Sequence, residues 1–274
     1  MKTTFKFTMA LAIWLSVGTA IAAPTETFLS GTGTLNFQDN YLRRGGILWI
    51  STTPKLINPG SLPANTASYD RDTRVVSLAY DGATVSAADG KVTFSAANSH
   101  VELFFGMTRE DNDGNPLSTL YRVIALDNIA VDLGNASVYA NVSSYYGTGE
   151  DFPIYADFGR LAVFKSMAPI ANGTQGLIVN GQASGSTAAD LMLTSAAADI
   201  VINGLYRLAG EPPVDPQSTL YKGVMSALWG SASASGTFAS PVPEASTQAL
   251  IVVGLLPLLA FSRRTRRSAS GPHW

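Results

Sequence analysis

Residues 83–94 read ATVSAADGKVTF, and this stretch decides the fold class. Two short runs containing β-branched and aromatic residues flank Asp89-Gly90, a dipeptide that favours the tight turn of a β-hairpin. Similar runs recur along the chain, with turn residues about every 8 to 12 positions, which is typical of antiparallel all-β domains. We therefore expect a mainly β fold, with a β-sandwich or jelly-roll-like domain.

The other expected strands are short apolar runs bounded by turn residues. In 136–142 (ASVYANV), the aliphatic residues at 138, 140 and 142 alternate with Tyr139 and Asn141, which is the period of a half-buried strand. Gly159 is expected to form a turn between two strands. The expected strands cover 31–37, 46–53, 74–80, 83–85, 91–94, 101–106, 120–126, 129–133, 136–142, 154–158, 161–165 and 177–179.

One segment has helical rather than strand character. Thr194 and Ser195 precede a run of alanines, and a hydroxyl residue in that place favours a helix N-cap. We expect one short helix near 195–205, with Gly204 as its end. Its residues 200–201 (Ile-Val) are expected to face a sheet.

The first 22 residues have the order of a secretory signal peptide. Lys2 and Lys6 precede an apolar run over 7–17, and small residues follow it. We expect this signal helix, residues 1–22, to be removed by signal peptidase after Ala22. The residues that mark the cleavage are Ala20, Ala22 and Ala23.

A second apolar block lies near the other end of the chain. Residues 249–261 (ALIVVGLLPLLAF) contain no charge, and as a helix they would span roughly 20 Å, against about 30 Å for a bilayer core. Four arginines follow at once, which by the positive-inside rule keeps that end in the cytoplasm and the main body outside. A marginal span with a basic stop suits a temporary anchor in the inner membrane.

Val242-Pro243-Glu244 stands just before this block. The motif, the apolar helix and the arginine cluster together resemble the PEP-CTERM sorting signal. This resemblance implies recognition by exosortase, a membrane-embedded cysteine protease/transpeptidase, and export in a Gram-negative bacterium that produces exopolysaccharide and biofilm. The residues to which it assigns the sorting signal are Val242, Pro243, Glu244, Arg263, Arg264, Arg266 and Arg267.

The signals leave one domain between them. We expect a β-rich extracellular domain over 23–230, a Ser/Ala/Gly spacer over 231–241 whose first residues could extend the domain as a last strand, the sorting signal over 242–267 and a tail over 268–274. Without both signals, 12 basic and 19 acidic residues remain, a net charge of −7. That balance argues against a nucleic-acid partner. The absence of cysteine excludes a disulfide framework and a thiolate metal site.

Few residues point to catalysis or to a cofactor, and we expect neither, nor a bound metal. Asp111–Asn115 (DNDGN) has the start of a calcium loop, but Arg122 holds the twelfth position, where a carboxylate ligand is needed; the same residues also make turns. A Ser-His-Asp triad would have to use His100, but the chain contains no Gly-x-Ser-x-Gly motif of a serine hydrolase. We therefore expect His100 at a strand edge. Of the carboxylates that a glycosidase would need, Glu102, Glu110 and Glu150 are available, but a solvated acidic surface is expected.

Tyr145 and Tyr146 begin what looks like an exposed loop, where they are possible sugar contacts because tyrosine rings stack on sugar faces. The leading hypothesis is a secreted or cell-surface protein of the exopolysaccharide matrix, with a structural or interaction role and no catalysis. The alternatives are a carbohydrate-binding module of the biofilm matrix and an extracellular glycoside hydrolase.

Overall fold

The computed structural model describes residues 26–38, 47–52, 65–110, 113, 116–148, 154–168, 175–187, 190–207 and 212–239. Within these ranges the protein is mainly β, and the described elements belong to the unit Phe28–Ala239. The strands are β1 (Thr27–Phe37), β2 (Ile47–Ser51), β3 (Ala67–Asp70), β4 (Val75–Tyr80), β5 (Gly82–Val85), β6 (Val92–Glu110), β7 (Pro116–Asp132), β8 (Ser137–Thr148), β9 (Ile154–Ser166), β10 (Gln182–Ser186), β11 (Leu191–Leu193) and β12 (Gly230–Ala239).

All twelve strands belong to one sheet, in the order β2-β6-β7-β8-β9-β11-β12-β1-β4-β3, with β10 paired to β12 and β5 to β6. The sheet curls, so β3 and β4, at one end of this order, also contact β6 near the other end. The amide of Thr66 donates to the carbonyl of Asn98 across this junction, at 3.2 Å. The curled sheet therefore encloses most of its buried apolar side chains in a single core.

The expected β-sandwich or jelly roll differs from this single sheet. The reason lies in β6 and β7, which are 19 and 17 residues long and paired along most of their length. Register shifts interrupt the β6–β7 ladder after Ala96 and the β7–β8 ladder after Asp127. Because such bulges bend strands and increase their twist, a long sheet can curl instead of dividing into two stacked sheets.

The same bulges explain why several expected strands were too short. The expected pairs 91–94 with 101–106, and 120–126 with 129–133, each lie in one strand, β6 or β7. Gly159 is not a turn but an interior residue of β9, where it takes a φ of 66° at a bulge against β8. The expected strand 177–179 forms only isolated bridges.

The stretch expected as a spacer over 231–241, with a last strand as the alternative for its start, is strand for most of its length, because Gly230–Ala239 forms β12. Burial alternates along it, with Ala232, Ala234 and Phe238 inside. Gly236 is also inside, and a Cβ there would lie 2.4 Å from Phe94. The small residues thus allow β12 to approach the core closely, which is not the behaviour of a flexible linker.

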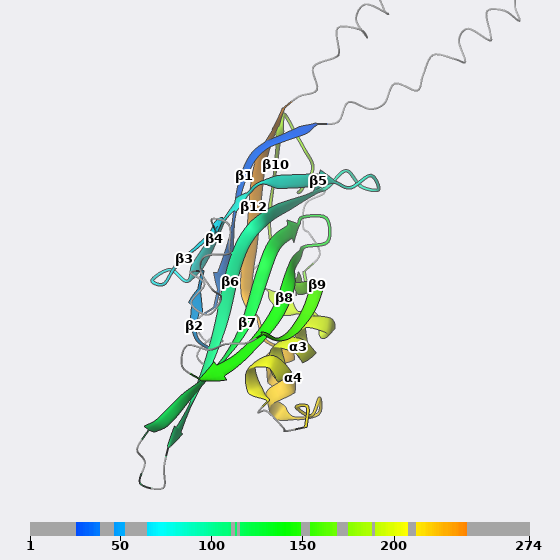
Figure 1. Ribbon diagram of the computed structural model, residues 1–274. Coiled ribbons are helices and arrows are strands. Elements are labelled where there is room, and N and C mark those ends of the chain that lie inside the picture. Colours follow the sequence, from blue (N-terminus) through cyan, green and yellow to red (C-terminus); the bar gives the residue numbers. More distant parts are fainter. Residues whose placement is uncertain are drawn as a thin grey trace, which may run out of the picture. The chain divides into compact units, whose positions relative to one another are not determined.

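Helix α3 (Ser195–Tyr206) confirms the helix expected near 195–205. Thr194 is its N-cap, and its hydroxyl accepts the amide of Ala197 at 3.2 Å. Gly204 does not end the helix: a Cβ there would lie 2.4 Å from Ile124, so this glycine allows α3 to lie close to the sheet. Figure 1 shows α3 beside β8 and β9, and a second helix, α4 (Thr219–Met225), which was not expected.

None of the helices in the described ranges has the length and apolar character that crossing a bilayer requires. The expected signal helix over 1–22 and the expected anchor over 249–261 lie outside those ranges.

Candidate functional site

Neighbouring strands of the sheet carry two candidate sites, one on each face: β7 and β8 contribute to the first, and β6 and β7 to the second. Ile124 lies opposite Ser144 in the ladder, and Arg122 lies opposite Tyr146. Because successive side chains of a strand point to opposite faces, these four residues share one face, which Gly204 of α3 approaches. The neighbouring residue Tyr145 therefore belongs to the other face.

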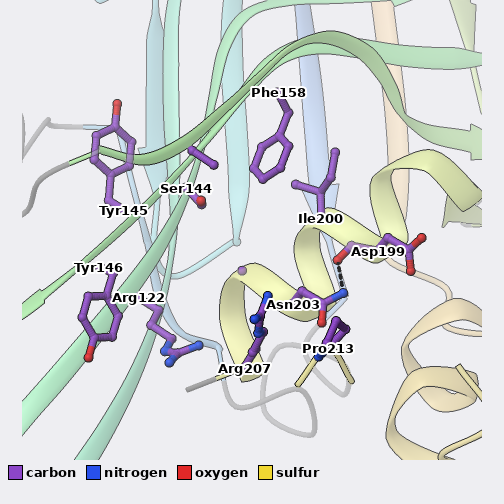
Figure 2. Close-up of a pocket in the computed structure, with 12 residues that line it drawn as sticks. Arg122, Ser144, Tyr145, Tyr146, Phe158, Asp199, Ile200, Asn203, Arg207 and Pro213 are labelled. Atoms are coloured by element: carbon purple, nitrogen blue, oxygen red, sulfur yellow. Dashed lines mark hydrogen bonds between the residues drawn. The ribbon is translucent and has the colours of Figure 1, made fainter. Parts of the chain in front are cut away.

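A pocket of about 310 Å³ lies between this face and α3. Its wall is largely apolar and aromatic, with two arginines, one aspartate and a serine. Figure 2 shows these side chains, which come from β7, β8, β9, α3 and the segment after it. The lining residues are Arg122, Ser144, Tyr146, Ala156, Phe158, Asp199, Ile200, Asn203, Gly204, Arg207 and Pro213, together with Tyr145, which precedes Tyr146 on β8 but packs with Phe104, Val123 and Ala125 of the other face.

Two cations line this pocket. Arg122 is only 3% exposed, and its guanidinium carbon lies 5.3 Å from the centre of the Tyr146 ring, within range of a cation–π contact. Arg207 is the C-cap of α3 and is half-buried. A cation is favoured there because the end of a helix carries a partial negative charge.

The polar groups on the α3 side of the pocket are already engaged. The Tyr221 hydroxyl donates to the Asp199 carboxylate at 2.5 Å, a bond that raises the pKa of Tyr221 to about 12. The Asn203 side chain donates to the backbone carbonyl of Asp199 and accepts the amide of Val214. On the sheet side, the Ser144 hydroxyl is buried and finds no hydrogen-bond partner among the described residues.

The opposite face carries a second buried group of charges, which we name the histidine cluster: His100, Glu102 and Asp127. The Nδ1 atom of His100 lies 2.6 Å from Asp127 Oδ1, and Nε2 lies 3.0 Å from Glu102 Oε1. The side chains of His100 and Glu102 are 4% and 1% exposed, whereas that of Asp127 reaches the surface at 28%.

Burial alone would lower the pKa of His100, but the hydrogen bonds and negative charges of Asp127 and Glu102 raise it to about 9. His100 is therefore a buried cation between two carboxylates near neutral pH. Both of its ring nitrogens are engaged, which leaves neither of them to activate a serine hydroxyl. The expectations of a strand-edge His100 and a solvated Glu102 are corrected, because both side chains lie within β6 and are buried beside Asp127 of β7.

The structure also corrects the placement of the two tyrosines. Both lie in β8, not in an exposed loop. Tyr145 is 6% exposed and packs with Phe104, Val123 and Ala125, and this burial raises its pKa. Tyr146 is half-buried and lies on the pocket face. The two rings lie on opposite faces of the sheet, as Figure 2 illustrates, so they do not form one stacking platform.

Several of the expected site residues lie outside the ranges that the structure describes. This is true of the cleavage residues Ala20, Ala22 and Ala23, of the sorting signal over 242–267, of Glu150, and of the Glu110 side chain. Of the loop Asp111–Asn115 only Asp113 is described, and it is exposed. In the part of the chain that the structure describes, no group of three or more His, Asp or Glu side chains could hold a metal ion.

The described residues form a mainly β domain with one curled sheet and a helix-covered pocket on one of its faces. No family model matches the chain. No curated protein matches it either.

Two solved structures are similar in fold. The C-terminal domain of HtaA from Corynebacterium glutamicum has 11% sequence identity and a TM-score of 0.41, over 78% of this chain and 100% of that domain. The N-terminal domain of HtaA from the same organism has 14% identity and a TM-score of 0.38, over 78% of this chain and 99% of that domain. Both likenesses are distant and concern the fold alone.

Proposed function

We propose that this chain is an exported surface or exopolysaccharide-matrix protein with a structural or interaction role. Signal peptidase removes its N-terminal segment, and the C-terminal apolar helix anchors it briefly in the inner membrane. Exosortase then processes the tail, and the β-domain is secreted or remains at the cell surface.

The position of the domain between the two signals carries this proposal. Strand β1 begins at Thr27, shortly after the expected cleavage at Ala22. Strand β12 ends at Ala239, shortly before Val242, and its residue Phe238 is buried in the core. Removal of both signals would therefore leave every described strand and helix intact, as maturation of a folded exported domain requires.

The described side chains favour binding over catalysis. His100 is held between two carboxylates, and Glu102 is buried against it. A glycosidase needs two carboxylates that face each other across an open cleft, and the buried Glu102 is not placed as one of them. The pocket on the other face has a concave apolar wall with a few polar groups, which is the usual character of a ligand site.

The processing part of the proposal is tested in the native host with Pro243→Ala/Glu244→Ala, using Ser246→Ala/Thr247→Ala as the matched control. We expect the wild type and the control outside the inner membrane, and the Pro243/Glu244 variant retained there with its arginine tail. Fractionation followed by mass spectrometry gives the readout. If the Pro243/Glu244 variant leaves the membrane as the wild type does, exosortase processing is wrong.

The carbohydrate-binding alternative now depends on Tyr146, because Tyr145 is buried. It predicts that Tyr146→Ala abolishes retention of the protein on exopolysaccharide from its host, whereas Tyr139→Ala, elsewhere on β8, does not. Retention of the Tyr146→Ala protein at the wild-type level would remove this alternative.

A further inference from the structure

The pocket between β7, β8 and α3 combines three features that seldom occur together on a protein surface. It is enclosed enough to hold about 310 Å³, it is walled by apolar and aromatic side chains, and it contains two cations. A volume of this size lies at the lower end of the range for small-molecule sites. A ligand there would be about as large as one or two fused six-membered rings.

The described residues of the pocket wall carry more positive than negative charge, in contrast to the domain around them. They include Arg122, Arg207 and one carboxylate, Asp199, which accepts the hydroxyl of Tyr221. The segment between the two signals has a net charge of −7. A locally cationic pocket in an acidic domain favours an anionic ligand, and guanidinium groups pair with carboxylates through charge-assisted hydrogen bonds.

Ser144 gives an independent indication of a ligand. Its side chain lies on the pocket face of β8 and is 2% exposed, yet its hydroxyl has no hydrogen-bond partner among the described residues. Leaving a buried hydroxyl unpaired is unfavourable. A ligand oxygen in the pocket, which both arginines also line, would satisfy this hydroxyl.

The rest of the wall defines the body of the ligand. The Tyr146 ring lies against Arg122 on the sheet side, and Phe158, 39% exposed, lies on β9. Ile200 and Pro213 add apolar surface from α3 and the segment after it. Such a wall offers few partners for the several hydroxyl groups of a sugar, whereas a flat apolar ring can cover it.

We propose that this pocket binds a small organic carboxylate with a flat apolar body. The carboxylate contacts Arg122, Arg207 and the Ser144 hydroxyl, and the ring lies among Tyr146, Phe158 and Ile200. This site is independent of the processing of the tail, so either proposal can fail without the other.

The test uses the full chain in a non-ionic detergent, with 2-naphthoate as the anionic probe and 2-naphthylmethanol as its neutral counterpart. Equilibrium dialysis measures binding of each probe, with detergent alone as the background. We expect naphthoate to bind at least about tenfold more tightly than the neutral alcohol, the difference that one charge-assisted hydrogen bond supplies.

Two pairs of variants locate the site. Arg207→Gln is compared with Lys222→Gln, which removes the same charge from exposed α4 outside the pocket. Phe158→Ala is compared with Leu228→Ala, which removes a similarly exposed apolar side chain elsewhere. These positions lie at or near the surface, so the test does not depend on whether variants of buried Arg122 fold.

We expect Arg207→Gln and Phe158→Ala each to weaken naphthoate binding by about fivefold or more, with the two controls unchanged. Three results would overturn the proposal. One is the absence of naphthoate binding, and another is equal binding of the two probes. The third is tighter binding of galacturonate than of naphthoate, which would make the pocket a sugar-acid site.

Discussion

The two faces of the sheet around β7 both bury charged side chains, but the surroundings of those charges differ. On one face, His100 lies between Asp127 and Glu102, and its positive charge is balanced by neighbours from the sheet itself. On the other face, Arg122 and Arg207 line a pocket, and the Ser144 hydroxyl there has no partner among the described residues.

This difference distinguishes the histidine cluster, whose role is structural, from the pocket, which is a candidate binding site. A buried charge whose partners come from the protein stabilises one arrangement of the chain, and losing a partner costs stability. A pocket that holds a buried hydroxyl with no partner among the described residues can still gain from a ligand. Changes to the histidine cluster should therefore affect unfolding most, whereas changes to the pocket should affect binding most.

The largest expected effect comes from His100→Leu. The variant leaves the Glu102 carboxylate buried without its cation, which costs about 3–5 kcal/mol in the free energy of unfolding. Urea denaturation of the full chain measures it. The double variant His100→Leu/Glu102→Leu should recover most of the loss, because it removes both buried charges. A single variant within about 1 kcal/mol of wild type would show that the cluster is not structural.

The pH dependence of stability should follow the same cluster. The pKa of His100 is about 9 in the folded protein and 6.5 ordinarily. Because the folded value is higher, the cluster's contribution is fully present below about pH 6.5 and is lost as the pH rises to about 9. The decline is up to about 3 kcal/mol. Urea midpoints between pH 6 and 9.5 should show it in the wild type, and a decline of equal size in His100→Leu would contradict this assignment.

A smaller effect is expected from the helix that covers the pocket. Thr194 is the N-cap of α3, and its hydroxyl also donates to the carbonyl of Ala162 on β9. Thr194→Ala removes both bonds and should lower the free energy of unfolding by about 1 kcal/mol. Ser218→Ala removes the corresponding cap of α4, whose hydroxyl accepts the amide of Tyr221. Because α3 packs on the sheet along five buried residues and α4 buries only Val224, the Ser218 variant should lose less. If the two variants lower the thermal stability equally, the packing of α3 on the sheet adds nothing to the effect of its cap.

The sequence was informative where a signal is local. The Asp89-Gly90 turn, the alternation over 136–142 and the Thr194 cap depend on neighbouring residues, and the structure has a turn, a strand and a helix there. The sequence could not show that β6 and β7 each continue through a bulge, because a bulge depends on the pairing between strands. The small residues of 230–239 indicated a linker as readily as a last strand for the same reason: the close approach of Gly236 to Phe94 depends on pairing between distant parts of the chain.

Both candidate sites were missed for a related reason. His100, Glu102 and Asp127 alternate on adjacent strands, and only the β6–β7 register brings them together. Arg122 was noticed only as a position where a calcium ligand is absent. The available signal was a charged residue within the apolar run 120–126, since a charge in a buried strand needs either a partner or a ligand.

The central claim is that this β-domain is released from between two sorting signals. The most direct test is the intact mass of the protein recovered from outside the cells of its native host. The account predicts a mass that corresponds to a start near Ala23 and an end near Pro243, with any additional mass identifying what is joined to the new C-terminus. A mass that still includes Arg267 and Trp274 would contradict it, because the tail would then be retained.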